Sequence, residues 1–100
     1  MSRGVFMTTF LQQRARIPQG ILFKDMAGEA VLLNLNTETY YGLDELGTRM
    51  WQVATTSETL QHAYDILLDD YEVEPDVLRA DLIRLINELV SDGLLEITDP

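Results

Sequence analysis

The sequence predicts an α+β domain with a winged-helix-like architecture, in which a three-stranded antiparallel sheet packs on three helices. Three observations predict this fold. Short apolar runs separated by turn residues occupy the chain before Asp44, the apolar spacing becomes helical after it, and two breaks divide the helical part into three segments. Strands grouped ahead of helices are typical of α+β folds.

The length and composition are those of one domain with one core, because the chain has 100 residues and 46% of them are hydrophobic. We expect residues 1–16 to be a flexible N-terminal segment and residues 17–100 to form the domain. There is no cysteine and no apolar run of about 20 residues, so neither disulfides nor a membrane-spanning helix is predicted. No signal-peptide pattern is present, and we expect a cytoplasmic monomer.

Three strands are predicted in the first half of the chain, and they cover residues 20–24, 30–35 and 39–43. Turn residues at 26–29 and 36–38 join them, which is typical of an antiparallel meander. Side chains alternate between the two faces of a strand, so Tyr41 and Leu43 point to one face and Tyr40 to the other. A core needs only one of these tyrosines.

The helical half begins at Asp44, whose carboxylate is a predicted N-cap. The segment 55–59 ends the first helix, and Thr55 with Glu58 fits a capping box for the second, with Thr56 or Ser57 as alternative caps. The second helix carries apolar residues at helical spacing, namely Leu60, Tyr64, Leu67, Leu68 and Tyr71.

The third predicted helix covers residues 75–92, with a proline at its first position. Gly93 is placed for a left-handed C-cap. Residues 94–98 after it fit either a short final strand or an extended tail.

The third helix has a wide apolar arc of roughly 160°, where a core-facing helix requires about 100°. Its central stripe consists of Leu78, Leu82, Leu85 and Leu89, and its additional sector consists of Ile83, Ile86 and Val90. Arg79 projects into this sector, and the solvent side carries Asp81, Arg84 and Glu88. Either the sheet and the other helices cover the whole arc, or part of it lines a ligand groove.

An edge strand beside such a helix would form a receptor for an extended peptide, in which backbone pairing gives affinity and side-chain pockets give selectivity. In this hypothesis one of the two tyrosines serves the core and the other the groove.

The charge argues against nucleic-acid binding. The net charge is −10, and residues 44–100 hold three basic and fourteen acidic side chains, against four and three in residues 1–43. Such a surface repels phosphate backbones. An enzyme is not predicted, since His62 is the only histidine and no catalytic set, phosphate loop or metal-binding motif is present. The acidic run of residues 69–76 lacks the spacing of a calcium loop. We therefore expect no catalytic residues, no cofactor and no metal.

Two long stretches of the chain resemble the PqqD-like family. They are AVLLNLNTETYYGLDELGTRMW and DDYEVEPDVLRADLIRLINELVSDGLL, and the similarity extends over residues 17–97. The resemblance implies a domain that binds the leader segment of a ribosomally made precursor peptide and presents it to modifying enzymes. It implies that the leader adds as a strand to the third strand and lies against the third helix.

On this chain, the implied peptide-binding residues are Glu38, Thr39, Tyr40, Tyr41, Leu78, Arg79, Leu82, Ile83 and Ile86. The junction YYGLDELG is closer to the stand-alone members of lasso-peptide pathways, in which the partner enzyme is a protease or a cyclase. The alternatives are a PqqD-type chaperone for a radical SAM enzyme in the maturation of pyrroloquinoline quinone or a related peptide, and a general acidic adaptor between proteins.

Overall fold

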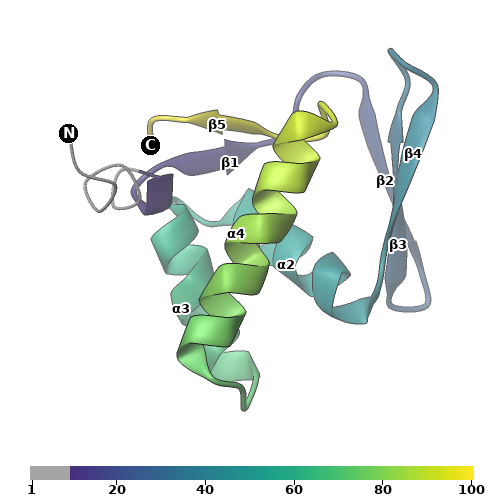
Figure 1. The fold of residues 1–100 in the computed structure, drawn as a ribbon. Helices are drawn as coiled ribbons and strands as arrows, with labels where there is room; N and C mark the ends of the chain where they lie inside the picture. Colours follow the sequence, from purple (N-terminus) through teal and green to yellow (C-terminus); the bar gives the residue numbers. More distant parts are fainter. Residues whose placement is uncertain (1–9) are drawn as a thin grey trace.

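A computed structural model describes residues 10–100, and it confirms the predicted order of three antiparallel strands followed by three helices (Figure 1). The main sheet has the order β2-β3-β4. Its strands are β2 (Ile21–Met26), β3 (Glu29–Asn34) and β4 (Thr39–Leu43). The helices are α2 (Glu45–Thr56), α3 (Leu60–Asp70) and α4 (Pro75–Ser91). A second, two-stranded sheet pairs β1 (Arg14–Arg16) with β5 (Glu96–Thr98).

Two tight turns set the register of the main sheet. The β2–β3 turn has positive φ angles at Ala27 (61°) and Gly28 (91°), and the Asp25 carboxylate accepts the Gly28 N–H at 2.9 Å. In the β3–β4 turn, the buried Asn34 side chain accepts the backbone N–H of Asn36 at 2.9 Å. These bonds place Leu33 opposite Tyr40 and Leu32 opposite Tyr41.

The helix starts agree with the prediction at α2 and differ from it at α3. Asp44 caps α2 by accepting the Gly47 N–H at 2.7 Å, as predicted. The cap of α3 is Thr59, which accepts the His62 N–H at 3.1 Å, so the predicted capping box and its alternatives are wrong. The hydroxyls of the three candidates donate instead to carbonyls in the last turns of α2; these residues are Thr55, Thr56 and Ser57. They are occupied in ending one helix and are therefore not free to begin the next.

The end of α4 has the geometry of a Schellman motif. Gly93 has a φ angle of 74°, and its N–H donates to the Val90 carbonyl at 3.1 Å. The Leu94 N–H donates to the Leu89 carbonyl at 2.8 Å, which satisfies a second carbonyl of the last turn. The predicted left-handed C-cap is confirmed, and the chain then continues into β5 rather than into a tail.

The structure differs from the predicted flexible segment at residues 10–16. Leu11 and Ala15 are buried, with 6% and 1% of their surface exposed. The Gln13 carbonyl accepts the Leu60 N–H at 2.8 Å, and β1 pairs with β5. A strand of three residues that alternates arginine with one alanine has too little apolar pattern to be recognised in the sequence. Residues 1–9 of that predicted segment lie outside the described residues.

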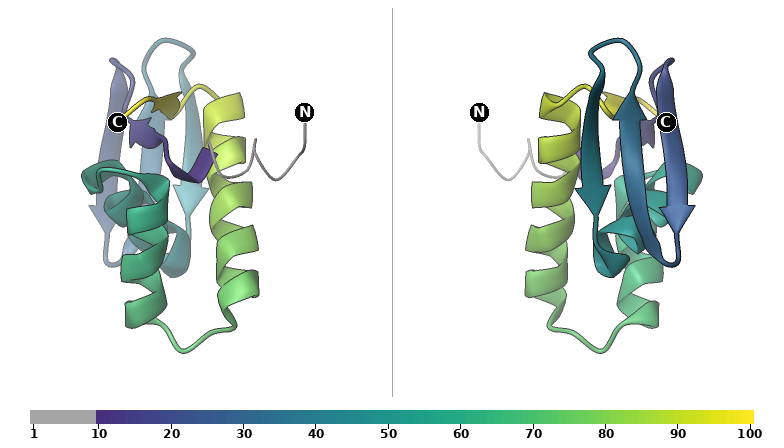
Figure 2. Two further views of the ribbon diagram at one scale, coloured as in Figure 1. Left: turned by 90° about the vertical axis from the view of Figure 1, so that its left-hand side faces the viewer. Right: turned by 90° about the vertical axis from the view of Figure 1, so that its right-hand side faces the viewer.

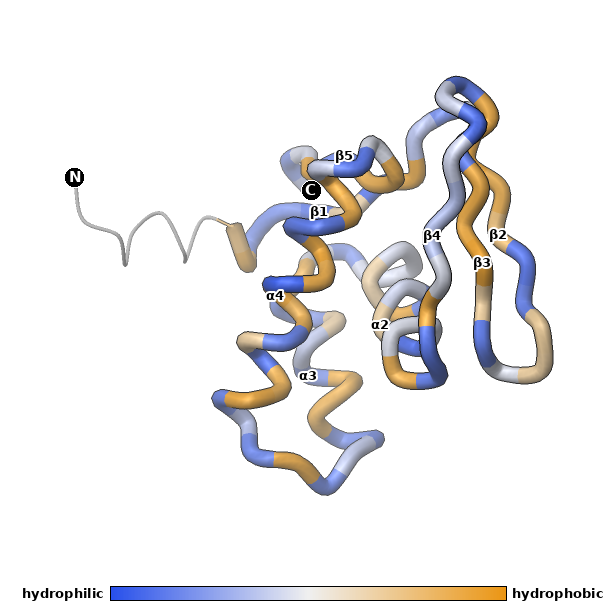
Figure 3. The backbone as a smooth tube through the Cα atoms, turned by 45° about the vertical axis from the view of Figure 1, so that its right-hand side comes forward, coloured by the Kyte–Doolittle hydropathy of each residue, from blue (hydrophilic) through white to orange (hydrophobic). Residues whose placement is uncertain are grey.

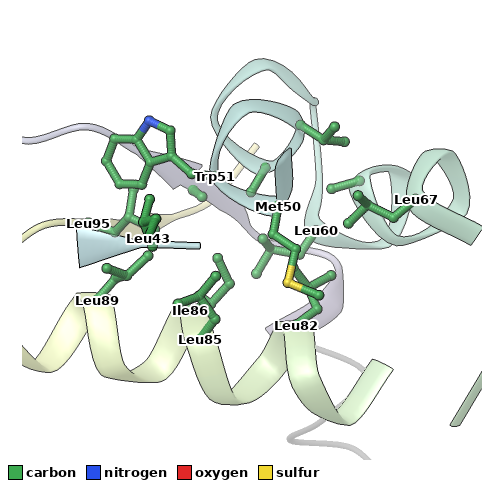
Figure 4. Packing of buried hydrophobic residues seen from close by; sticks show 14 of the residues in the cluster. Leu43, Met50, Trp51, Leu60, Leu67, Leu82, Leu85, Ile86, Leu89 and Leu95 are labelled. Atoms are coloured by element: carbon green, nitrogen blue, oxygen red, sulfur yellow. The ribbon is translucent and has the colours of Figure 1, made fainter. Parts of the chain in front are cut away.

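The core lies between the inner face of the main sheet and the three helices (Figures 1 and 4). Hydrophobic residues occupy most of β3, and on α4 they recur between hydrophilic ones (Figure 3); Leu32 of β3 and Leu82, Ile86 and Leu89 of α4 belong to the core. Trp51 is 2% exposed, and its ring is stacked on Phe23 with a centroid separation of 6.3 Å. A buried hydrogen bond from the Ala30 N–H to the Thr48 hydroxyl, at 2.9 Å, ties the sheet to α2. Within residues 10–100, no helix is long and apolar enough to cross a bilayer.

Candidate functional site

β4 is an edge strand, and its outer edge faces α4. The sheet order places β3 on one side of β4, and within residues 10–100 no strand pairs with its other side. Figure 2 shows α4 running alongside that open edge. In an antiparallel ladder, every second residue of an edge strand directs its N–H and C=O away from the sheet. These backbone groups are available to an added strand.

A hollow of about 280 Å³ lies between β4, the start of α2 and α4. We call it the first hollow. Its apolar residues are Leu43, Leu46, Met50 and Leu85. Its charged residues are Asp44, Asp81, Arg84 and Glu88. Leu43, Met50 and Leu85 are at most 9% exposed, so they form the base of this hollow and the charged residues form its rim.

A second hollow of about 350 Å³ lies at the other end of β4. It is lined by Thr37, Thr39, Tyr40, Tyr41, Asp92 and Leu94. Tyr41 lines both hollows. We refer to the two hollows and the open edge of β4 together as the β4 groove.

Tyr41 bridges the β4 groove through its hydroxyl, which donates to Glu88 Oε2 at 2.6 Å. This hydrogen bond, assisted by burial and by the negative charges of Glu88 and Asp92, raises the pKa of Tyr41 to about 12. Arg84 opposes the shift, but it lies 3.5 Å from Asp81 and 3.8 Å from Glu88 and is shared between them. The field in the middle of the groove is therefore negative.

The strand residues of the predicted site lie in or next to the β4 groove. Thr39 and Tyr41 face it, and Tyr41 also packs against the core. Tyr40 is 78% exposed and also lines the second hollow, so the groove includes both tyrosines and only Tyr41 also contacts the core. Glu38 is exposed in the turn before β4 and has a φ angle of 57°.

The helix residues of the predicted site lie elsewhere. Leu78, Leu82 and Ile86 are 2%, 1% and 0% exposed and belong to the core, so they present no surface to a ligand. Arg79 and Ile83 line a separate, shallow hollow with Asp76, Ala80 and Arg84. The apolar arc that was predicted on α4 is therefore covered by the core at Ile86. A different sector of α4 faces β4.

The groove wall on α4 consists of Asp81, Arg84, Leu85 and Glu88. The helical spacing predicted a solvent position for the three charged residues. Asp81, Arg84 and Glu88 repeat at spacings of three and four residues, as the core stripe does. They therefore form the polar border of that stripe next to Leu85. The sequence shows this polar border, but it does not show which strand or helix the border faces. Within residues 10–100, no three histidine, aspartate or glutamate side chains gather as a metal site would require.

A small antiparallel sheet whose edge strand β4 lies beside a helix on a three-helix core defines the class of α+β domains that can accept a further strand. Comparison with known families identifies the family to which the chain belongs. The model of coenzyme PQQ synthesis protein D (PqqD) matches residues 29–95, and the chain belongs to the PqqD family.

Two solved structures are similar to the chain. The first is TbiB1 in complex with the TbiA(beta) leader peptide, which is 30% identical in sequence to this chain with a TM-score of 0.75. The match covers 81% of this chain and 94% of the TbiB1 chain. Lasso peptide synthetase B1 complexed with the leader peptide is 20% identical, also with a TM-score of 0.75, over 83% of this chain and 98% of that one. The second likeness concerns the fold alone. No curated protein sequence matches the chain.

Proposed function

We propose that this protein binds the leader segment of a ribosomally synthesised precursor peptide as an added strand on β4. The observation that carries the proposal is the open edge of β4, which faces α4 across the first hollow. The 30% identical TbiB1, which has the same fold, is complexed with a leader peptide. Strand addition would use backbone groups of residues 39–43, which are present whatever the side chains are.

The structure supports a different helix wall from the one that the sequence suggested. On the strand side we retain Glu38, Thr39, Tyr40 and Tyr41. On the helix side we propose that Asp81, Arg84, Leu85 and Glu88 contact the peptide, because they line the first hollow opposite β4. An apolar side chain of the peptide would fill the base of that hollow, against Leu43, Met50 and Leu85.

We propose that the protein has no chemistry of its own and acts in the cytoplasm by delivering its peptide to a modifying enzyme. Holding a precursor beside an enzyme raises the effective concentration of the substrate, which accelerates processing without a new catalytic group. The resemblance of the junction YYGLDELG to members of lasso-peptide pathways implies a protease or a cyclase as the partner enzyme, and the 30% identical TbiB1 is solved in complex with a leader peptide.

The test is a titration of isotope-labelled protein with the leader of a short precursor encoded beside this gene, followed by amide shifts in NMR. We expect the largest shifts in residues 39–43 and 81–88. Leu46→Ala should weaken binding several-fold, since Leu46 lines the first hollow. Ile83→Ala is the matched control, because Ile83 is also half-buried but lines the separate hollow on α4. Shifts confined to residues 65–74, with β4 silent, would refute strand addition.

A further inference from the structure

The geometry of the β4 groove points to a sequence preference in its ligand. We propose that the bound peptide carries an apolar side chain followed, four residues later, by a lysine or arginine. The apolar side chain occupies the first hollow, and the cation lies beside Asp92 at the second hollow, one helical turn from Glu88. This inference rests on the proposed function, because it assumes that the peptide pairs with β4.

The spacing follows from the positions of the two hollows along β4. Thr39, Tyr41 and Leu43 point to the same side of the strand. The first hollow lies at Leu43 and the second at Thr39, four residues apart. Residues directly opposite one another in an antiparallel pair point to the same face, so the two anchors of the peptide are also four residues apart.

The order of the anchors follows from the direction of pairing. The main sheet is antiparallel throughout, and antiparallel pairing is slightly more stable per residue than parallel pairing. A peptide antiparallel to β4 meets Leu43 first and Thr39 last. The apolar anchor is therefore on the N-terminal side of the cation, and a parallel peptide would show the reverse order.

The charge of the second anchor follows from the carboxylates of α4. Arg84 neutralises part of the charge of Asp81 and Glu88, since it is within 4 Å of both. Among residues 10–100, no basic side chain lies within ion-pair distance of Asp92. Asp92 lines the second hollow, and Glu88, one helical turn before it on α4, accepts the hydrogen bond from Tyr41, which lines both hollows. A cation in the second hollow would lie beside the carboxylate of Asp92, which has no ion-pair partner among residues 10–100.

The Tyr41–Glu88 bridge adds a third feature to the preference. It crosses the groove between the two hollows, and Tyr41 lines both of them. The peptide residue opposite Tyr41 is the one midway between the anchors. A glycine, alanine or serine at that position leaves the bridge intact, whereas a large side chain would have to displace it.

The test is selection of a displayed library of random peptides on the full chain, repeated with two charge variants. The wild-type protein should enrich an apolar residue with lysine or arginine four positions later. Asp92→Lys should lose the preference for the cation and favour aspartate or glutamate at that position, and lysine is well tolerated near a helix C-terminus. Asp69→Lys is the matched control, because Asp69 is exposed on α3 away from the groove and the net charge changes equally.

A synthetic peptide of the selected sequence makes the test quantitative. Replacing its cation by glutamine should weaken binding about two- to five-fold at low salt, the range for a solvent-exposed ion pair. Glu88→Gln keeps an acceptor for Tyr41, and it should reduce the effect of that replacement. The difference should shrink as salt is added.

The outcomes separate the two proposals. Selected peptides that shift β4 amides but carry no cation preference would overturn this inference and leave the proposed function standing. An equal loss of preference in Asp69→Lys would also overturn it, since overall charge would then be the cause. Selected peptides that shift no β4 amide would overturn the proposed function itself.

Discussion

The hydrogen bond from Tyr41 to Glu88 predicts a measurable difference between two adjacent tyrosines. Tyr41→Phe removes a 2.6 Å bond to a carboxylate, whereas Tyr40→Phe removes a hydroxyl that has no protein hydrogen-bond partner among residues 10–100, on a side chain that is 78% exposed. We therefore expect Tyr41→Phe to lower the free energy of unfolding and Tyr40→Phe to leave it unchanged. Both variants conserve the ring, so packing is preserved.

The magnitude can be derived from the pKa of Tyr41. A rise from 10.0 to about 12 corresponds to about 2.7 kcal/mol if every interaction were fully shielded from water. The bond lies at an exposed position in the groove, where solvent screens charges, so we reduce this figure to about 1 kcal/mol. A hydrogen bond of ordinary net strength contributes a similar amount.

The pH dependence has a defined sign. The pKa of Tyr41 is higher in the folded than in the unfolded protein, because the neutral phenol is the form that donates to Glu88. Its stabilising contribution is therefore complete below pH 10 and is lost as the pH rises through about 12. The stability difference between the wild type and Tyr41→Phe should shrink over that window.

Two measurements check this prediction. Denaturant melts at neutral pH should separate the two phenylalanine variants by about 1 kcal/mol. NMR of protein with isotope-labelled tyrosine should show that the pKa of Tyr41 is raised to about 12, and Glu88→Gln should bring this pKa down. If the two variants have equal stability and the pKa of Tyr41 is not raised, the Tyr41–Glu88 bridge does not form in solution.

Three further predictions concern the fold and its charge. Ala27→Asn should raise the free energy of unfolding by roughly 0.5–1 kcal/mol, because Ala27 has a φ angle of 61° and asparagine before glycine suits this turn; a fall in melting temperature would contradict it. Ile86→Ala should lower the free energy of unfolding by about 2–5 kcal/mol in denaturant melts, since Ile86 is fully buried; a change below half a kilocalorie would show that α4 is rotated from the described position. Labelled duplex DNA should show no salt-dependent change in fluorescence anisotropy with micromolar protein, because three basic and fourteen acidic side chains occupy residues 44–100.

Features encoded by neighbouring residues were predictable from the sequence. The Asp44 cap and the Gly93 C-cap each depend on a few adjacent positions, and both are present. The alternation of Tyr40 and Tyr41 follows from the geometry of a strand alone. The cap of α3 was not predictable, because several hydroxyls in residues 55–59 compete and the choice depends on where α2 ends.

The helix side of the candidate site could not be predicted from the sequence, for a different reason. Helical periodicity gives the angle between two residues on α4, but not the rotation of α4 relative to the sheet. The apolar sector at Ile86 therefore looked available, although it is part of the core. The polar border at Glu88 looked solvated, although it faces β4. Only the tertiary arrangement distinguishes a groove wall from a solvent face.

The position of α4 beside the open edge of β4 also bears on aggregation. An exposed edge strand is a template for pairing with the same strand of another molecule, and proteins usually protect such edges. Here α4 runs alongside the open edge of β4, and the first hollow lies between them. The β4 edge of a second molecule would bring its own α4 and its own carboxylates at Asp81, Glu88 and Asp92. The same helix that offers a wall to one peptide strand thus hinders pairing between the β4 edges of two molecules.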